Sequence, residues 1–227
     1  MSKQTPIEML EVVASALADL CDEIVFVGGT IVVLLITDPA APPVSSTKDI
    51  DLVVSVTTRY EYSERLGGRL RELGFSEDSS EDAPLCRWRR NGMKVDVMPT
   101  NPDILGFSNR WFTLAFETSV RVPLPSGREV RIPTAPCFLG TKLEAFHSRG
   151  EGDFLSSKDI EDFLAVVHGR DAVVQEVAAA PEELKFYLAE NVSALLKKGG
   201  FVDSIEGHLP GEDREVVLGR LRRICAR

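Results

Sequence analysis

Strand-like segments occur only in the first 133 residues of this 227-residue chain, and helical patterns fill the rest. Short apolar runs bounded by turn residues, as expected of strands, occupy 24–27, 49–56, 85–90, 93–98, 118–122 and 129–132. Beyond Pro133, apolar residues recur at helical spacing over 134–149, 157–168, 171–179, 182–198 and 212–225. This division predicts an α/β (or α+β) domain at 1–133, followed by an α-helical domain at 134–227.

Capping and turn residues fix where several elements begin and end. Residues 5–8 (Thr-Pro-Ile-Glu) form a capping box, which starts a helix. Gly28-Gly29 ends the first strand, and Asn91-Gly92 is a strong hairpin signal. A second hairpin turn is expected at 125–127. Helices in the first domain are therefore expected at about 6–19, 30–36 and 59–73.

Charge and hydropathy exclude several classes of protein. With 26 basic and 35 acidic residues the formal charge is −9, which argues against sequence-blind coating of nucleic acid and against binding to anionic membranes. The longest apolar candidate, 31–36, is too short to span a bilayer, and the N-terminus lacks a signal core. We therefore expect no membrane partner and a cytoplasmic location. The four cysteines show no metal-finger or CxxC spacing and are expected to be reduced, structural thiols.

Two aspartates on one strand give the sharpest chemical signal. Side chains alternate along a strand, so Asp49 and Asp51 project from the same face. Asp96, between two valines on a later strand, adds a third carboxylate if that strand lies beside the first. Because three such carboxylates repel one another, a hard cation such as Mg²⁺ is their natural compensator. The alternative is a pair of acids lining the wet face of an edge strand.

A glycine pair precedes this motif by 21 residues. Gly28-Gly29-Thr30 ends a strand and opens a helix, where exposed backbone N–H groups can bind an anion. Glycine permits close approach of a triphosphate, although an ordinary tight turn has the same composition. A cradle for phosphates beside paired aspartates predicts phosphoryl or nucleotidyl transfer.

The helical half contains one lysine on an apolar face. On a helical wheel Lys142 lies within the apolar arc of 134–149, and Arg149 projects in nearly the same direction two turns on. Lys142 therefore needs a partner, unless its stem packs and its ammonium reaches the solvent. Asp159 opens the next helix, where it can simply favour the helix dipole.

The N-terminal motifs resemble a known superfamily. Gly28-Gly29-Thr30, the segment 47–52 and Val95-Asp96-Val97 are similar to the nucleotidyltransferases with the DNA-polymerase-β-like catalytic fold, over roughly residues 24–98. The resemblance implies a mixed sheet with flanking helices. It assigns nucleotide phosphates to Gly28, Gly29 and Thr30, and two Mg²⁺ ions to Asp49 and Asp51. It makes Asp96 a further ligand, or a base, that helps to activate the acceptor hydroxyl.

The helical half extends the resemblance to about residue 168. Lys142, Arg149, Lys158-Asp159 and Asp162 are similar to the Lys…Arg…Arg-Asp-x-x-Asp segment of AbiEii-type toxin nucleotidyltransferases, found in toxin–antitoxin and abortive-infection systems. This implies that Lys142 and Asp159 belong to the active site, with Lys142 neutralising the triphosphate, in a cleft that the helical domain completes. The chain differs from the pattern at Ser45 and Lys158, where relatives carry arginine.

The function expected from these features is Mg²⁺-dependent transfer of a nucleoside monophosphate from an NTP to an acceptor, with release of pyrophosphate. The toxin-like resemblance favours an RNA acceptor such as tRNA and a cognate antitoxin protein. The alternatives are a small-molecule acceptor, as in antibiotic-modifying nucleotidyltransferases, and a catalytically silent nucleotide-binding module that acts through a partner.

Three further groups of residues have weaker signals. Residues 87–90 (Arg-Trp-Arg-Arg) could contact a polynucleotide acceptor by stacking and phosphate binding, or could form the solvated face of a sheet. The three histidines share no ligand spacing and are expected at the surface. The arginines of the C-terminal helix are expected on a solvated face.

Overall fold

The computed structural model describes residues 4–45, 47–149, 153–209 and 212–226. The chain forms two compact units. The α/β unit comprises Met1–Val33 and Ser45–Thr134, and the helical unit comprises Leu34–Val44 and Ala135–Arg227. A segment of the N-terminal half, Leu34–Val44, is thus part of the helical unit, where the Thr37 and Asp38 amides donate hydrogen bonds to the Gly169 carbonyl.

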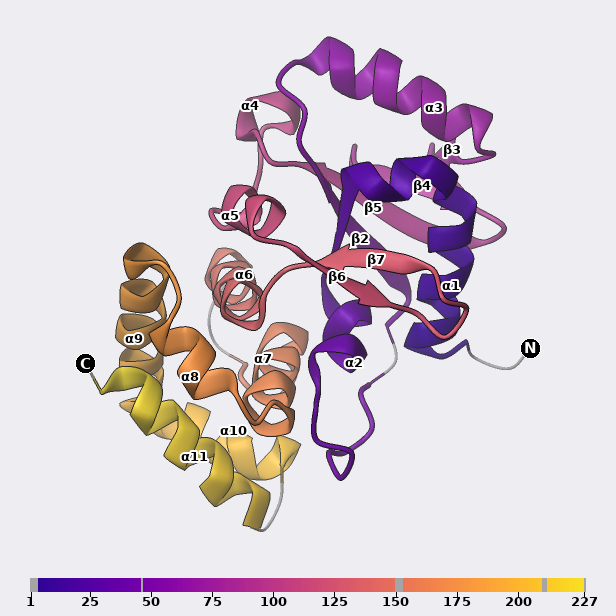
Figure 1. The fold of residues 1–227 in the computed structure, drawn as a ribbon. Coiled ribbons are helices and arrows are strands. Elements are labelled where there is room, and N and C mark those ends of the chain that lie inside the picture. The colour runs from indigo at the N-terminus through magenta and orange to yellow at the C-terminus, as the bar shows by residue number, and fades with distance from the viewer. Residues whose placement is uncertain (1–3, 46, 150–152, 210–211, 227) are drawn as a thin grey trace. The chain divides into compact units, whose positions relative to one another are not determined.

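A five-stranded mixed sheet forms the centre of the α/β unit (Figure 1). Its strand order is β1-β2-β5-β4-β3. Strands β2 and β5 are parallel and the other neighbours are antiparallel. The strands are β1 (Ile24–Val27), β2 (Asp49–Val54), β3 (Ser76–Glu77), β4 (Arg87–Arg90) and β5 (Met93–Pro99).

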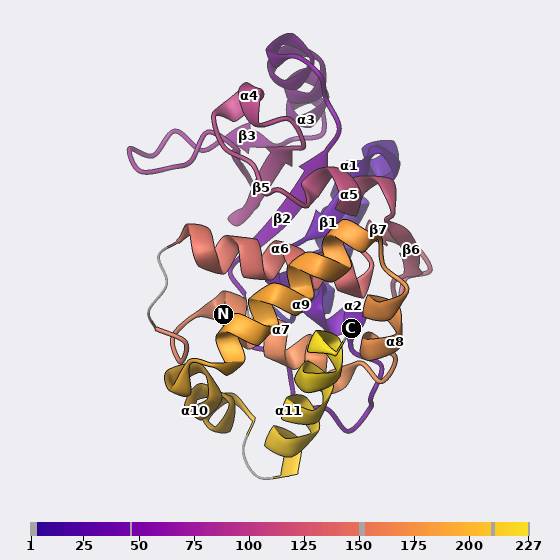
Figure 2. The ribbon, with the colours of Figure 1, turned by 90° about the vertical axis from the view of Figure 1, so that its left-hand side faces the viewer.

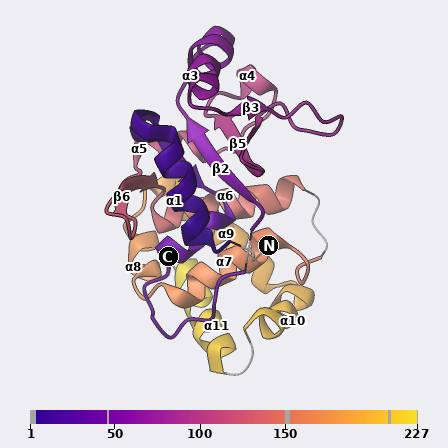
Figure 3. The same cartoon turned by 90° about the vertical axis from the view of Figure 1, so that its right-hand side faces the viewer.

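One face of this sheet is apolar along its whole length. Ile50, Leu52, Val95 and Val97 are fully buried there, as expected for alternating strand positions that face a core. Helix α1 (Pro6–Leu17) starts at the predicted capping box. Figure 3 shows this helix and the sheet from another side. The π-helix η3 (Glu61–Leu66) continues into α3 (Gly67–Glu72), and the Tyr62 hydroxyl donates to the Val97 carbonyl at 2.7 Å.

The opposite face is apolar at one end and charged at the other. Its apolar end packs Val25, Val27 and Val53 against Phe112. The remaining elements of this unit are η1 (Ala18–Glu23), η2 (Gly29–Ile31), α4 (Pro102–Leu105), α5 (Phe112–Glu117) and the hairpin β6 (Val120–Pro123) with β7 (Glu129–Ile132). Helix α2 (Val32–Leu35) runs from this unit into the helical one.

The helical unit has a core of large apolar side chains. Figure 2 shows the ribbon of its helices. Phe138, Phe163, Leu188 and Phe201 are among its fully buried residues. The helices are α6 (Ala135–Ser148), α7 (Lys158–Gly169), α8 (Val173–Ala178), α9 (Glu182–Leu196), α10 (Gly199–His208) and α11 (Glu212–Cys225).

Two surface predictions for this unit are wrong. Arg220 is not on a solvated face, because its guanidinium donates to the Val167 and His168 carbonyls at the C-terminal end of α7, where cations are favoured. His168 is buried, with Nε2 3.2 Å from an Asp213 carboxylate oxygen. The apolar spacing of 212–225 predicted this helix, but it did not show which residues of the helix face α7.

The predicted α/β class with a helical C-terminal region is confirmed, and the Asn91-Gly92 turn has positive φ at both residues, as the type I′ turn requires. The elements β3, α4, α5 and α10, and the part of η1 beyond residue 19, were not predicted. β3 and α4 have only two and four residues, which is too short to show a hydrophobic period. No helix in the described part of the chain combines the length and apolar character that a membrane span requires.

Candidate active site

Three predicted aspartates share one face of the sheet. Asp51 on β2 lies directly beside Asp96 on the parallel strand β5, and Asp49 precedes Asp51 by two residues on the same face. The Asp96 side chain is 11% exposed, whereas the Asp49 side chain is 39% exposed. The parallel pairing, which no local pattern reveals, brings these carboxylates together. We call these residues, with Arg87, the carboxylate cluster.

The predicted glycine turn lies directly against this cluster. Gly28 has φ +72°, and a Cβ at this position would lie 1.9 Å from Oδ2 of Asp51. Only glycine can therefore occupy this position without displacing the carboxylate. Gly29 begins the 3₁₀ helix η2. Thr30 is fully buried and its hydroxyl donates to the Asp49 carbonyl at 3.0 Å, which ties the turn to β2.

Arg87 is a member of the cluster that sequence reasoning placed elsewhere. Its Nε and Nη2 donate to the two oxygens of Asp96 at 2.8 and 2.7 Å, and Nη2 lies 3.7 Å from Asp49 Oδ2. The side chains of Arg87 and Asp96 are only 18% and 11% exposed. The Asp96 carboxylate raises the pKa of Arg87. The hairpin register could have predicted this pair, because a two-residue turn at Asn91-Gly92 pairs Arg90 with Met93 and therefore Arg87 with Asp96.

The oxygen donors of Asp49 and Asp51 suit a hard cation. Both oxygens of Asp96, in contrast, already accept hydrogen bonds from Arg87. Within the described ranges, no three acidic, histidine or cysteine side chains converge closely enough to form a ready-made metal site. Asp49 and Asp51 are therefore the residues that would hold a first Mg²⁺, and the three-aspartate, two-ion arrangement stays a prediction.

The Arg-Trp-Arg-Arg segment does not present an aromatic ring for stacking on a base. Trp88 is 4% exposed, and the Arg71 guanidinium lies 5.7 Å from the centroid of its ring. Arg87 and Arg89 share the face opposite Trp88, as strand alternation predicted, and Arg89 pairs with Asp78 at 2.7 Å. The proposed stacking role of this segment is therefore wrong for Trp88, because the ring is part of the core.

Beside this segment, Cys86 is a buried free thiol. Desolvation, helped by the charge of Asp96, raises its pKa to about 12. The other three cysteines are free as well, which agrees with the expected reduced state.

In the helical unit, Lys142 pairs with two buried aspartates. Its Nζ lies 3.2 Å from Oδ1 of Asp159 and 2.6 Å from Oδ2 of Asp162, and all three residues are at most 8% exposed. The second oxygen of Asp159 accepts a hydrogen bond from Arg149 at 2.7 Å, whose side chain is 72% exposed. We call these four residues the lysine network. The lysine does not reach the solvent in the way that the alternative interpretation required.

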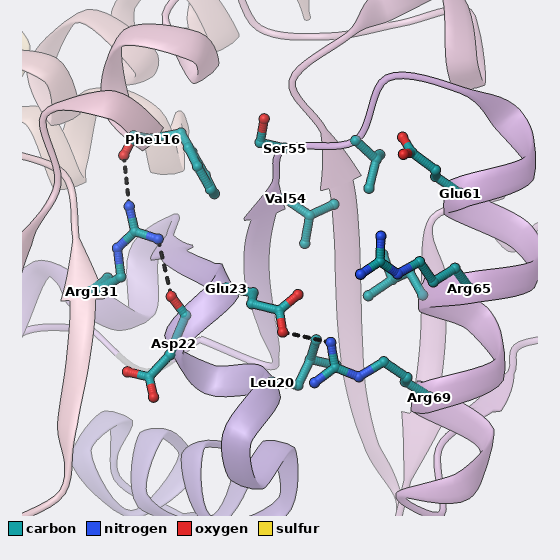
Figure 4. A pocket seen from close by; sticks show the side chains of 12 residues that line it. Leu20, Asp22, Glu23, Val54, Ser55, Glu61, Arg65, Arg69, Phe116 and Arg131 are labelled. Atoms are coloured by element: carbon teal, nitrogen blue, oxygen red, sulfur yellow. Dashed lines mark hydrogen bonds and ion pairs between the residues drawn. The ribbon is translucent and has the colours of Figure 1, made fainter.

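A hollow of about 440 Å³ lies at the other end of β2, beside Val54 (Figure 4). Three arginines line it together with apolar and acidic residues. Arg69 pairs with Glu23 at 2.6 Å, and Arg131 donates to the Asp22 and Phe116 carbonyls. None of the carboxylate-cluster residues lines it, so the predicted site and this hollow are separate.

Comparison with known proteins gives the fold but no family. No family model matches the chain, and no curated protein matches it. Among solved structures, the chain is similar to an antigenic nucleotidyltransferase-like protein from Paracoccidioides brasiliensis. The TM-score is 0.53 at 19% sequence identity, over 90% of this chain and 93% of that one. The chain therefore has a nucleotidyltransferase-like fold.

Proposed function

We propose that this protein is a Mg²⁺-dependent nucleotidyltransferase that moves a nucleoside monophosphate from an NTP to an acceptor and releases pyrophosphate. One observation carries the proposal: the Asp51 carboxylate lies directly over Gly28, on the face that Asp49 and Asp96 share. A turn that presents backbone beside paired carboxylates can bring a triphosphate and its cation together. The nucleotidyltransferase-like fold supports the same reaction.

In this proposal each residue has a stated part. Asp49 and Asp51 hold the cation, and the backbone of Gly28 and Gly29 faces the phosphates, with Thr30 fixing the turn against β2. When bound, Mg²⁺ supplies positive charge that neutralises the triphosphate and its pyrophosphate product. Asp96 assists as a ligand or as the base for the acceptor hydroxyl, and either role requires Arg87 to release at least one of its oxygens.

The resemblance also gives Lys142 and Asp159 a part in nucleotide binding, which we keep as a prediction. The charge of Lys142 is already compensated by Asp159 and Asp162. Arg149 is the exposed cation of the network, and Asp159 orients it. We therefore expect Arg149→Met to lower affinity for the NTP with little loss of stability. An unchanged affinity would assign the lysine network to the fold alone.

The test of the proposed function uses NTPs labelled at the α-phosphate. We expect Mg²⁺-dependent NTP binding and incorporation of label into an acceptor, and loss of incorporation by about 10²-fold or more in Asp49→Ala and Asp51→Ala. Asp82→Ala is the matched control, since this exposed acid lies in the same unit outside the cluster. The absence of any NTP binding in the presence of Mg²⁺ would overturn the proposal.

The acceptor is tested in the same assay. Label transferred to total RNA, and to tRNA in particular, supports the RNA acceptor and motivates a search for an antitoxin partner. Label transferred to aminoglycosides supports the small-molecule acceptor. Calorimetric NTP binding without pyrophosphate release supports the silent module, which the engagement of both Asp96 oxygens by Arg87 favours as the second candidate.

A further inference from the structure

Arg87 supplies positive charge among the carboxylates that, in the proposed function, bind a metal ion. Its guanidinium binds both oxygens of Asp96 and lies 3.7 Å from Asp49, so it compensates charge on two strands at once. A planar guanidinium matches a carboxylate in this two-bond geometry, and such pairs are among the strongest hydrogen-bonded contacts in proteins. The pair is also largely shielded from solvent, which limits screening by salt.

We propose that Arg87 acts as a resident cation that limits the nucleotide-free protein to one divalent ion, bound by Asp49 and Asp51. This inference rests on the proposed function, because it concerns the same carboxylates. A second ion at Asp96 would have to displace at least one of the two charged hydrogen bonds and would then lie beside the guanidinium. Asp51 lies against the glycine turn, where a Cβ at Gly28 would be 1.9 Å from its Oδ2.

The strand that carries Arg87 provides a matched control. Arg89 follows two residues later and therefore projects from the same face. Its partner is Asp78, which lies outside the carboxylate cluster. Arg89→Gln removes the same charge from the same face of the strand without freeing any oxygen of the cluster.

The experiment is a titration of the full-length protein with Mn²⁺ alone, in the absence of nucleotide, followed by calorimetry and by the electron paramagnetic resonance signal of unbound Mn²⁺. We expect the wild-type protein and Arg89→Gln to bind one ion. We expect Arg87→Gln to bind a second ion, at least about tenfold more tightly than any further binding to the wild-type protein.

The double variant Arg87→Gln/Asp96→Asn keeps the proposal testable if Arg87→Gln does not fold, because it replaces both members of the buried pair by neutral amides. It offers no carboxylate to a second ion and leaves no uncompensated guanidinium beside Asp49, so we expect it to bind one ion with an affinity within about threefold of the wild-type protein. Asp49→Asn should weaken binding of this ion by at least about tenfold. Two ions or none on the wild-type protein, one ion on folded Arg87→Gln, or a tenfold loss of affinity in the double variant would each overturn the inference.

The outcome is separable from that of the proposed function. A protein that binds one Mn²⁺ but no NTP would refute nucleotidyl transfer and leave the role of Arg87 intact. A protein that transfers nucleotides but binds two Mn²⁺ ions in the absence of nucleotide would do the reverse.

Discussion

The carboxylate cluster of the α/β unit and the lysine network of the helical unit are built from the same kinds of side chain, but their charges add up differently. The cluster comprises three aspartates and one arginine, and the network comprises two aspartates, one lysine and one arginine. The network is therefore neutral, whereas the cluster keeps an excess of negative charge beside a partly exposed strand end.

We propose that the balanced charges of the network mainly stabilise the fold, whereas the excess charge of the cluster is available to bind a ligand. Buried charges stabilise a fold only when each finds its partners, as Lys142 does with Asp159 and Asp162. The carboxylate cluster has three aspartates and one arginine, and in the proposed function this excess of negative charge attracts a cation. Removing a charge from the lysine network should thus destabilise the helical unit, whereas removing the charge of the partly exposed Asp49 should leave the stability of the α/β unit nearly unchanged and weaken the proposed cation binding.

The largest effect is expected for Lys142→Met. This substitution leaves Asp159 and Asp162 buried without the charge of Lys142, and breaking a buried ion pair in this way costs about 3–5 kcal/mol. The measurement is the free energy of unfolding in urea. Lys158→Met is the control, because Lys158 pairs with Glu161 near the surface and should change stability by only about 0.5 kcal/mol. A loss below about 1 kcal/mol for Lys142→Met would remove the distinction drawn between the two groups.

Gly28→Ala should have the next largest effect. The new Cβ clashes with the Asp51 carboxylate, and the alanine must adopt the positive φ of Gly28. We therefore expect the free energy of unfolding to fall by roughly 2–3 kcal/mol. Gly127→Ala in the β6–β7 turn has a similar φ of +84° but no heavy atom within 4 Å of the new Cβ, and should lose only about 1 kcal/mol. The difference between the variants measures the close approach at Asp51, and equal losses would contradict it. Mn²⁺ affinity should fall in Gly28→Ala alone.

Features of the fold and of the candidate site could be predicted from the sequence where the pattern that indicates them spans only a few neighbouring residues. Gly28, Asp49 and Asp51 were identified because a turn composition and a strand alternation act within a few residues. The Arg87–Asp96 pair also follows from a local rule, the hairpin register, but an arginine beside a tryptophan suggested a nucleic-acid contact instead. The burial of Trp88 shows that the tryptophan serves the sheet core.

Other features depended on contacts between distant segments. The lysine network joins residues 17 and 20 positions apart on two helices, and only the packing of α6 against α7 decides which acid reaches Lys142. The apolar arc predicted that Lys142 needs a partner, but no spacing rule identified Asp162. Likewise Arg220 and His168 were expected at the surface, because nothing in their own helices shows which face a neighbour covers.

A smaller effect on stability is expected for Asp49→Asn. The Asp49 side chain is partly exposed and lies 3.7 Å from Arg87, so replacing its charge should change the free energy of unfolding by no more than about 0.5 kcal/mol. Asp162→Asn, which removes the charge closest to Lys142, should lose about 2 kcal/mol or more. Urea unfolding without divalent ions tests both, and a similar loss in the two variants would show that the cluster is as structural as the network.

The smallest effect is expected for Ser80→Ala, a substitution beside the ion pair of Arg89 with Asp78. Hydrogen bonds from Ser80, together with Arg89, lower the pKa of Asp78 to about 2. A carboxyl group with a lowered pKa in the folded state stabilises the protein above its ordinary value near 3.8, and this contribution is lost as the pH falls toward 2. Ser80→Ala should therefore raise the pKa of Asp78, which carbon-detected NMR titration measures. The difference in the free energy of unfolding from the wild-type protein should be constant above about pH 5 and disappear near pH 2.

Mn²⁺ binding should not change in Ser80→Ala, because the Arg89–Asp78 pair, unlike Arg87 with Asp96, lies outside the carboxylate cluster. A change in Mn²⁺ affinity in Ser80→Ala would mean that the two arginines of β4 act together, and that the charge at the site extends farther along the strand than the contacts of Arg87.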